Sequence, residues 1–264
     1  MKKNRKNRLN IPVKLISLAA IIFLVLMFVM VYTWKFLTTS DYFKIKEVIT
    51  GDTSSNNLSY LKGKNIFSID LRQESRYILE YFPECKNIRL VRILPNRVFV
   101  DLIRRKPLAL LKLYKYFSVD EDMVVFDAGG DPQQSGLPVI TGMETKIFGA
   151  KSGRKYNIKE LEFALNIIKE VKRNRLLRDY GIRKIYVPDT TNASVFIIPP
   201  PSEYGHMDSI SRYEGLEVKL SSERIRYKIS LLANLMVAGR KELNNIKYID
   251  IRFKEPVIKL KFAQ

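Results

Sequence analysis

The side chains that could support catalysis are few in this chain of 264 residues. It has one histidine, His206, and one cysteine, Cys85. Nucleophilic catalysis requires a nucleophile, a base and an orienting group within reach of one another. His206 follows three prolines in a stretch that is typical of an exposed loop, and Cys85 begins an apolar stretch where a small core residue fits. A His/Cys metal site is excluded by count.

Two short motifs resemble catalytic elements but lack the required context. Residues 151–155 contain both a Ser-x-x-Lys pattern and a Lys-Ser-Gly imitation of the Lys-Thr-Gly element of penicillin-binding enzymes. The two elements overlap here, whereas those enzymes take them from separate parts of the chain. The acidic run Asp120, Glu121 and Asp122 is predicted to be a solvated turn, since no second group completes a hydrolase pair. We therefore expect no enzymatic activity, no small-molecule substrate and no cofactor.

An uncharged, apolar run at residues 15–34 stands out near the amino terminus. At about 1.5 Å of rise per residue, a helix of this length spans roughly 30 Å, the thickness of a bilayer core. A cleaved signal peptide is the alternative, but it would have a shorter apolar core followed by small residues. The run ends instead at Tyr32, Trp34 and Phe36, as at a membrane interface. The sequence predicts a transmembrane helix over residues 15–37, in contact with lipid.

Charge predicts the orientation of this helix. Every ionisable side chain in residues 1–14 is basic, and fewer basic residues follow closely behind the helix. The positive-inside rule therefore leaves the tail in the cytoplasm and the bulk of the chain on the other side of the membrane. The whole chain carries 46 Lys and Arg against 27 Asp and Glu. With this topology, we attribute the positive charge to nearby anionic lipid headgroups rather than to nucleic acid.

Residues 43–107 are predicted to form a compact α+β unit. Asp70 can cap a helix that ends before Pro83, and residues 94–96 have the chemistry of a hairpin turn. The expected order is strand, helix, helix, strand, strand, at about residues 43–49, 58–61, 70–82, 88–93 and 97–103.

Residues 108–264 are predicted to form a second domain, a mixed β-sheet with helices. Strands are expected at residues 108–113, 116–119, 124–126, 182–187, 195–198, 247–253 and 257–262. Asn157, paired with Glu160, is expected to cap one helix. Ser221 is expected to cap another, which stops at Gly239.

Several short motifs occur in one consistent order along this part of the chain. They are Pro83, Arg92 and Pro95, followed by residues 100–107, 119–126, 137–142 and 248–253. In this order behind a single membrane helix, the motifs resemble those of the FtsQ/DivIB family of bacterial cell-division proteins, including its POTRA domain. Two positions depart from the family pattern, because Arg104 stands where the family commonly has Glu and Met123 where it commonly has Gly.

The resemblance implies a non-enzymatic scaffold of the division machinery, acting in septum formation in the bacterial cytoplasmic (inner) membrane. The implied partners are FtsB-like and FtsL-like division proteins, and septal cell-wall synthesis proteins are further candidates. In this family the last strands bind a strand of FtsB. By that resemblance, the candidate partner-binding residues are Tyr248, Arg252, Phe253, Lys254, Glu255 and Val257. Whether Phe253 lies in the interface or in the core is left open by the sequence.

Two other functions remain as alternatives. POTRA domains also occur in components of protein transport and outer-membrane assembly, but those usually carry several POTRA units or a barrel, and no series of lipid-facing strands follows here. A membrane-tethered cell-wall enzyme is opposed by the missing nucleophile, base and metal ligands.

Overall fold

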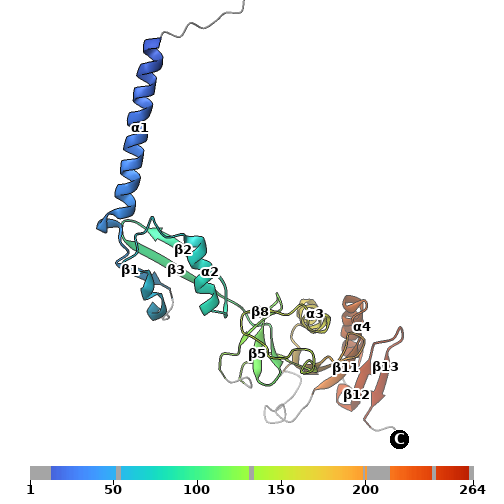
Figure 1. Ribbon diagram of the computed structural model, residues 1–264. Helices are drawn as coiled ribbons and strands as arrows, with labels where there is room; N and C mark the ends of the chain where they lie inside the picture. The colour runs from blue at the N-terminus through green and yellow to red at the C-terminus, as the bar shows by residue number, and fades with distance from the viewer. Residues whose placement is uncertain are drawn as a thin grey trace, which may run out of the picture. The chain divides into compact units, whose positions relative to one another are not determined.

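The computed structural model describes residues 13–51, 55–130, 134–198, 200, 215–239 and 242–261. It separates into two compact units, Met1–Leu79 with Asn87–Ile103 and Glu80–Lys86 with Arg104–Gln264 (Figure 1). The fold class is α+β, with one N-terminal apolar helix and a large mixed sheet, so that prediction is confirmed. Most of the predicted basic tail, at residues 1–12, and the loop with His206 lie outside the described residues.

The first helix, α1 (Val13–Thr39), is long and apolar enough to cross a membrane from Leu15 to Thr39. In the described part of the chain the side chains of residues 15–36 are all exposed. A helix that presents apolar side chains on every side is stable only in apolar surroundings. The predicted membrane-spanning segment, residues 15–37, therefore coincides with a continuous helix.

The first unit is a three-stranded sheet covered by helices. Its elements are η1 (Asp41–Phe43), β1 (Glu47–Thr50), η2 (Ser55–Leu61), α2 (Leu71–Tyr81), β2 (Cys85–Ile93) and β3 (Arg97–Arg104). The strand order is β1-β3-β2, and β1 runs parallel to β3. Asp70 caps α2 as predicted, since its Oδ1 accepts hydrogen bonds from the N–H groups of Arg72 and Gln73. Arg92 donates to the carbonyls of Ile66 and Ile69 and so ties β2 to the segment before α2.

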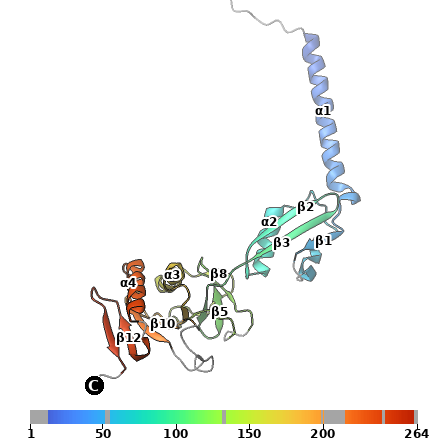
Figure 2. The same cartoon turned by 180° about the vertical axis from the view of Figure 1, so that it is seen from behind.

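The second unit is built on a ten-stranded sheet in the order β13-β12-β11-β10-β9-β7-β4-β5-β6-β8. The helices α3 (Lys159–Arg173) and α4 (Ile225–Ala238) lie side by side on this sheet (Figure 2). Apolar residues of both helices and of most strands form one continuous buried core. The strands are β4 (Ala109–Lys112), β5 (Tyr116–Val119), β6 (Val124–Asp127), β7 (Val139–Thr141), β8 (Arg154–Lys155), β9 (Gly181–Tyr186), β10 (Ala193–Ile198), β11 (Leu216–Leu220), β12 (Ile246–Asp250) and β13 (Val257–Leu260), and a short 3-10 turn, η5 (Leu243–Asn245), precedes β12.

Two predicted helix caps are wrong. The residue at the start of α3 is Ile158, which makes no side-chain capping bond, so Asn157 does not cap this helix. The residue at the start of α4 is Arg224, in the left-handed conformation at φ 51°, and Ser221 does not cap it. The hydroxyl of Ser221 instead accepts a hydrogen bond from Lys228. Gly239 ends α4 as predicted.

The prediction of a solvated turn over Asp120, Glu121 and Asp122 is wrong for Asp120, whereas Glu121 and Asp122 lie in a turn and are exposed and partly exposed. Asp120 is 2% exposed, and its Oδ2 lies 2.6 Å from Nη1 of Arg105. Its Oδ1 accepts the N–H groups of Asp122 and Val124, so both carboxylate oxygens have partners. A buried carboxylate is tolerated when it is paired and hydrogen-bonded in this way. Cys85 is buried at the start of β2, as expected for a small core residue.

Candidate partner-binding edge

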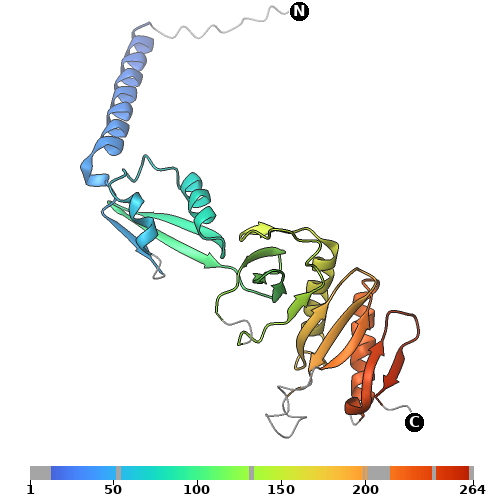
Figure 3. The ribbon, with the colours of Figure 1, turned by 60° about the horizontal axis from the view of Figure 1, so that its bottom comes forward.

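Strand β13 is the terminal strand of the large sheet and pairs, among the described strands, with β12 alone (Figure 3). All four of its residues are exposed. The strand at the other end, β8, has two residues, both basic, and a short charged edge of this kind resists pairing with another chain. β13 is longer and has three apolar residues and one lysine, so its edge is less protected. Its free edge is therefore the better template for an added strand.

Alternation along β13 directs its side chains to two faces of the sheet. Ile258 lies opposite Ile249, and Leu260 lies opposite Ile246. Ile249 and Ile246 belong to the buried core under the helices, whereas Ile258 is 44% exposed and Leu260 is 47% exposed. Residues opposite each other in a ladder share a face. Ile258 and Leu260 thus extend the core to the sheet edge, where an incoming strand would complete their burial.

The other face of β13 carries Val257 and Lys259, opposite Asp250 and Tyr248. Tyr248 is half-buried, and its ring lies below two ammonium groups, Lys219 Nζ at 4.2 Å and Lys259 Nζ at 5.9 Å from the centroid. Tyr248 and Val257 are among the residues expected from the sequence. This face of the edge consequently carries an aromatic ring with two ammonium groups over it, together with the carboxylates of Glu217 and Asp250.

Four of the expected residues, Arg252, Phe253, Lys254 and Glu255, lie in the loop between β12 and β13 rather than in a strand. β12 ends at Asp250, so the predicted strand over residues 247–253 is too long. Phe253, Lys254 and Glu255 are all exposed. Phe253 is 64% exposed, and the guanidinium of Arg252 lies 5.3 Å from its ring centroid. Phe253 is therefore not a core residue.

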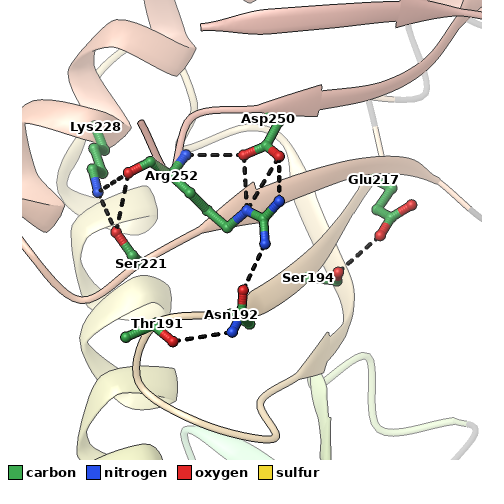
Figure 4. Close-up of polar contacts among 8 residues, drawn as sticks. All are labelled: Thr191, Asn192, Ser194, Glu217, Ser221, Lys228, Asp250 and Arg252. Carbon is green, nitrogen blue, oxygen red and sulfur yellow. Dashed lines mark hydrogen bonds and ion pairs between the residues drawn. The ribbon is translucent and has the colours of Figure 1, made fainter. Parts of the chain in front are cut away.

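Arg252 is held by partners within the chain (Figure 4). Its Nε and Nη2 donate to the carboxylate of Asp250 at 3.0 and 2.6 Å, and its Nη1 donates to Oδ1 of Asn192 at 2.6 Å. Burial alone would raise the pKa of Asp250, but the hydrogen bonds and charge of Arg252 outweigh it, and the pKa lies below its ordinary value. Asp250 in turn raises the pKa of Arg252. In this arrangement the side chain of Arg252 fixes the start of the loop.

The sequence alone does not single out Ile258, Leu260, Lys219 and Lys259, which the structure places at this edge. The sequence does contain an indication of Ile258 and Leu260. If the run Val-Ile-Lys-Leu at residues 257–260 forms an edge strand, it exposes apolar side chains on both faces of the sheet. Which strand lies at the edge is a property of the sheet order, which the run itself does not contain. Lys219 comes close to Tyr248 because β11 pairs with β12 in a register that sets Glu217 opposite Tyr248, and Lys219 is the next residue of β11 on the same face.

The chain is similar to two cell-division proteins. It is 24% identical over 195 residues to the cell division protein FtsQ of Syntrophotalea carbinolica, covering 70% of this chain and 68% of that protein. It is 23% identical over 198 residues to the cell division protein FtsQ of Geotalea daltonii, covering 75% of this chain and 66% of that protein. No protein-family model matches the chain. The two similarities, together with one N-terminal apolar helix in the described part of the chain and the α+β fold, support an assignment to the FtsQ/DivIB family of bacterial cell-division proteins.

Proposed function

We propose that the chain is a non-enzymatic scaffold of the division machinery that recruits FtsB-like and FtsL-like partners through the free edge of β13 during septum formation. A role in cell division follows from the similarity to the two FtsQ proteins. The observation that carries the finer proposal is an edge strand with three exposed apolar residues. Main-chain hydrogen bonds would supply affinity to an added strand, and alternate side chains would supply selectivity.

The proposed topology has one membrane crossing at α1. The basic residues ahead of the helix favour a cytoplasmic amino terminus, which leaves the rest of the chain outside the cytoplasm. We assign residues 43–107 as a POTRA domain and residues 108–264 as the FtsQ-type domain that carries the edge. Recruitment would then occur on the side of the membrane where the septal wall is built.

The partner strand should match the two faces of β13. Next to Ile258 and Leu260 it should place apolar side chains, because these extend the buried core. On the other face, next to Lys259, acidic or aromatic side chains would complement the ammonium groups and the ring of Tyr248. Phe253, at the end of the strand, would add an exposed aromatic contact.

Changing Phe253 to Lys is expected to weaken binding of the FtsB-like partner about tenfold or more, since an exposed aromatic anchor is lost. The melting temperature should be almost unchanged, because a side chain that is 64% exposed contributes little to the core. Titration of the purified chain with the partner's extracytoplasmic segment measures the affinity, and thermal unfolding measures the stability.

The matched control is Phe148→Lys. Phe148 is 81% exposed in the same unit, in the segment between β7 and β8, and β8 is at the opposite end of the sheet from β13, so the same chemical change there should leave binding intact. Equal binding by the Phe253→Lys variant and the wild-type chain would contradict a contact at Phe253. Equal loss in both variants would mean that added charge, not position, weakens the complex.

A further inference from the structure

The side chain of Lys228, on α4, is buried beneath the loop that leads into β13. Lys228 is 7% exposed. Its ammonium group donates one hydrogen bond to Oγ of Ser221 and another, at 3.1 Å, to the backbone carbonyl of Arg252 (Figure 4). Neither contact is evident from the sequence, because seven residues separate Lys228 from Ser221 and 24 separate it from Arg252.

Burying this ammonium group has an unfavourable free energy. Among the described residues no carboxylate forms an ion pair with Lys228, and burial lowers its pKa although the charges of Glu223 and Asp250 oppose that change. A buried cation bonded only to neutral oxygens gives less stability than an apolar side chain of similar volume would. Stability therefore does not explain why a lysine is at position 228, and we consider which part of the chain its hydrogen bonds hold in place.

One of those hydrogen bonds holds Arg252, the second residue after the end of β12. The side chain of Arg252 is fixed by Asp250 and Asn192, on one side of the chain, and its carbonyl is fixed by Lys228, on α4. The preceding residue, Ile251, donates its N–H to the carbonyl of Lys219. After Arg252, the next pairing with β12 begins at Val257. The direction in which the loop leaves β12 thus depends on the contacts of Arg252.

We propose that Lys228 is a positioning residue for partner recruitment: by holding the carbonyl of Arg252 to α4, it keeps the loop over residues 252–256 and the start of β13 in the conformation that accepts a strand. This inference rests on the proposed function of β13. When a binding-competent conformation is only partly populated, apparent affinity falls by the same fraction. Loss of the Lys228 contact would lower that population.

A nucleophilic role for the Ser221 and Lys228 pair does not fit the same geometry. A serine next to a lysine can be activated when the lysine takes its proton, provided that the hydroxyl faces a substrate. Ser221 is 8% exposed, and its Oγ lies 3.5 Å from the carbonyl of Arg252, which occupies the space next to it. Both side chains thus contact the backbone carbonyl of Arg252.

The test compares Lys228→Met with Ser221→Ala in the full-length chain held in detergent. Lys228→Met keeps the length and packing of the side chain but removes the hydrogen bond to Arg252, whereas Ser221→Ala leaves that bond in place. Without any partner, hydrogen exchange should be at least tenfold faster in Lys228→Met at the backbone amides of residues 252–258, apart from Pro256, which has no amide hydrogen, and exchange in α3 should be unchanged. The affinity for the partner's extracytoplasmic segment should fall about tenfold in Lys228→Met and stay within twofold of wild type in Ser221→Ala.

A purely structural role would give a different pattern. Exchange would then rise across the whole second unit, and binding would return to the wild-type value at a temperature where the variant is fully folded. Either that pattern or unchanged exchange at residues 252–258 overturns the proposal, as does a loosened loop with wild-type affinity.

If Lys228→Met does not fold, Lys228→Gln is the variant to test. Its shorter amide should raise exchange at residues 252–258 severalfold and weaken binding in proportion, and unchanged values overturn the proposal.

The two readouts also separate this proposal from the function on which it rests. If the wild-type chain does not bind the partner segment at all, recruitment through β13 is wrong. Hydrogen exchange, which needs no partner, then still decides whether Lys228 holds the loop.

Discussion

Replacing Ile258 by proline is expected to abolish recruitment of the FtsB-like partner while leaving the fold of the second unit in place. Lys261 donates its N–H to the carbonyl of Asn245, the residue before β12. Because successive N–H groups alternate in direction along a strand, those of Val257 and Lys259 also point toward β12, and those of Ile258 and Leu260 point to the free edge. A proline at position 258 thus removes a donor that only an added strand would use.

The expected size of this effect follows from the lost hydrogen bond and the added ring. A net backbone hydrogen bond contributes about 0.5–1.5 kcal/mol, and the proline ring also obstructs the approach of a second strand, so affinity should fall by more than about tenfold. The melting temperature should fall by only a few degrees. Calorimetric titration with the partner segment and thermal unfolding of the free chain are the two measurements.

Two further variants of β13 test whether the effect of Ile258→Pro comes from the loss of the N–H that faces the free edge. Ile258→Val keeps the N–H and the preference for strand and should retain binding within about threefold. Lys259→Pro removes an N–H that points toward β12 and should destabilise the pairing of β12 with β13 as well as binding. Wild-type affinity in Ile258→Pro would rule out strand addition at β13.

Placing two arginines in the middle of α1, as in Leu24→Arg with Phe28→Arg, is expected to release the chain from the membrane and to block division. Both side chains lie well inside the apolar segment from Leu15 to Thr39. Each arginine at the centre of a membrane helix costs roughly 2.5–3.5 kcal/mol on an insertion scale. Fractionation of cells should find the variant outside the membrane, and cells that depend on it should grow as unseparated filaments.

The control places the same charges at the end of the helix, as in Tyr32→Arg with Phe36→Arg. Long basic side chains near a helix end reach the headgroup region, so anchoring should persist. If the central variant is soluble and cells still divide, the membrane helix is not needed for function. If cells lose outer-membrane assembly rather than division, the chain acts in a different machinery.

Much of the fold could be predicted from the sequence because some patterns have one physical solution. The uncharged run over residues 15–34 lies in one continuous helix that is long and apolar enough to cross a membrane, and Asp70 ahead of an amphipathic segment caps α2. Where side chains have several possible partners, the local pattern fails. Ser221 is placed to cap α4 by its sequence position but bonds to Lys228, and Asp120 lies in a turn-like acidic run but is paired with Arg105. Both competing partners are brought close only by the tertiary fold.

The candidate site was predicted less completely, for a reason that lies in the sheet. The expected region, at residues 248–257, contains the loop and the ends of both strands, and the resemblance to the family supplied it. The exposure of Ile258 and Leu260 depends on β13 being the terminal strand of ten, an order that involves strands from the whole second unit. The loop contacts of Lys228 likewise depend on where α4 lies on the sheet. Periodicity along one segment cannot carry this information.

Site-specific crosslinking in growing cells tests recruitment through β13 most directly. A photo-crosslinking amino acid at position 258 should form an adduct with the FtsB-like partner in dividing cells, and the same probe at position 148 should form none. The yield of the adduct should fall in Lys228→Met, in line with the weaker binding expected of that variant. A chain that is membrane-bound and supports normal division, yet gives no partner adduct from position 258, 260 or 253, would contradict recruitment through this edge.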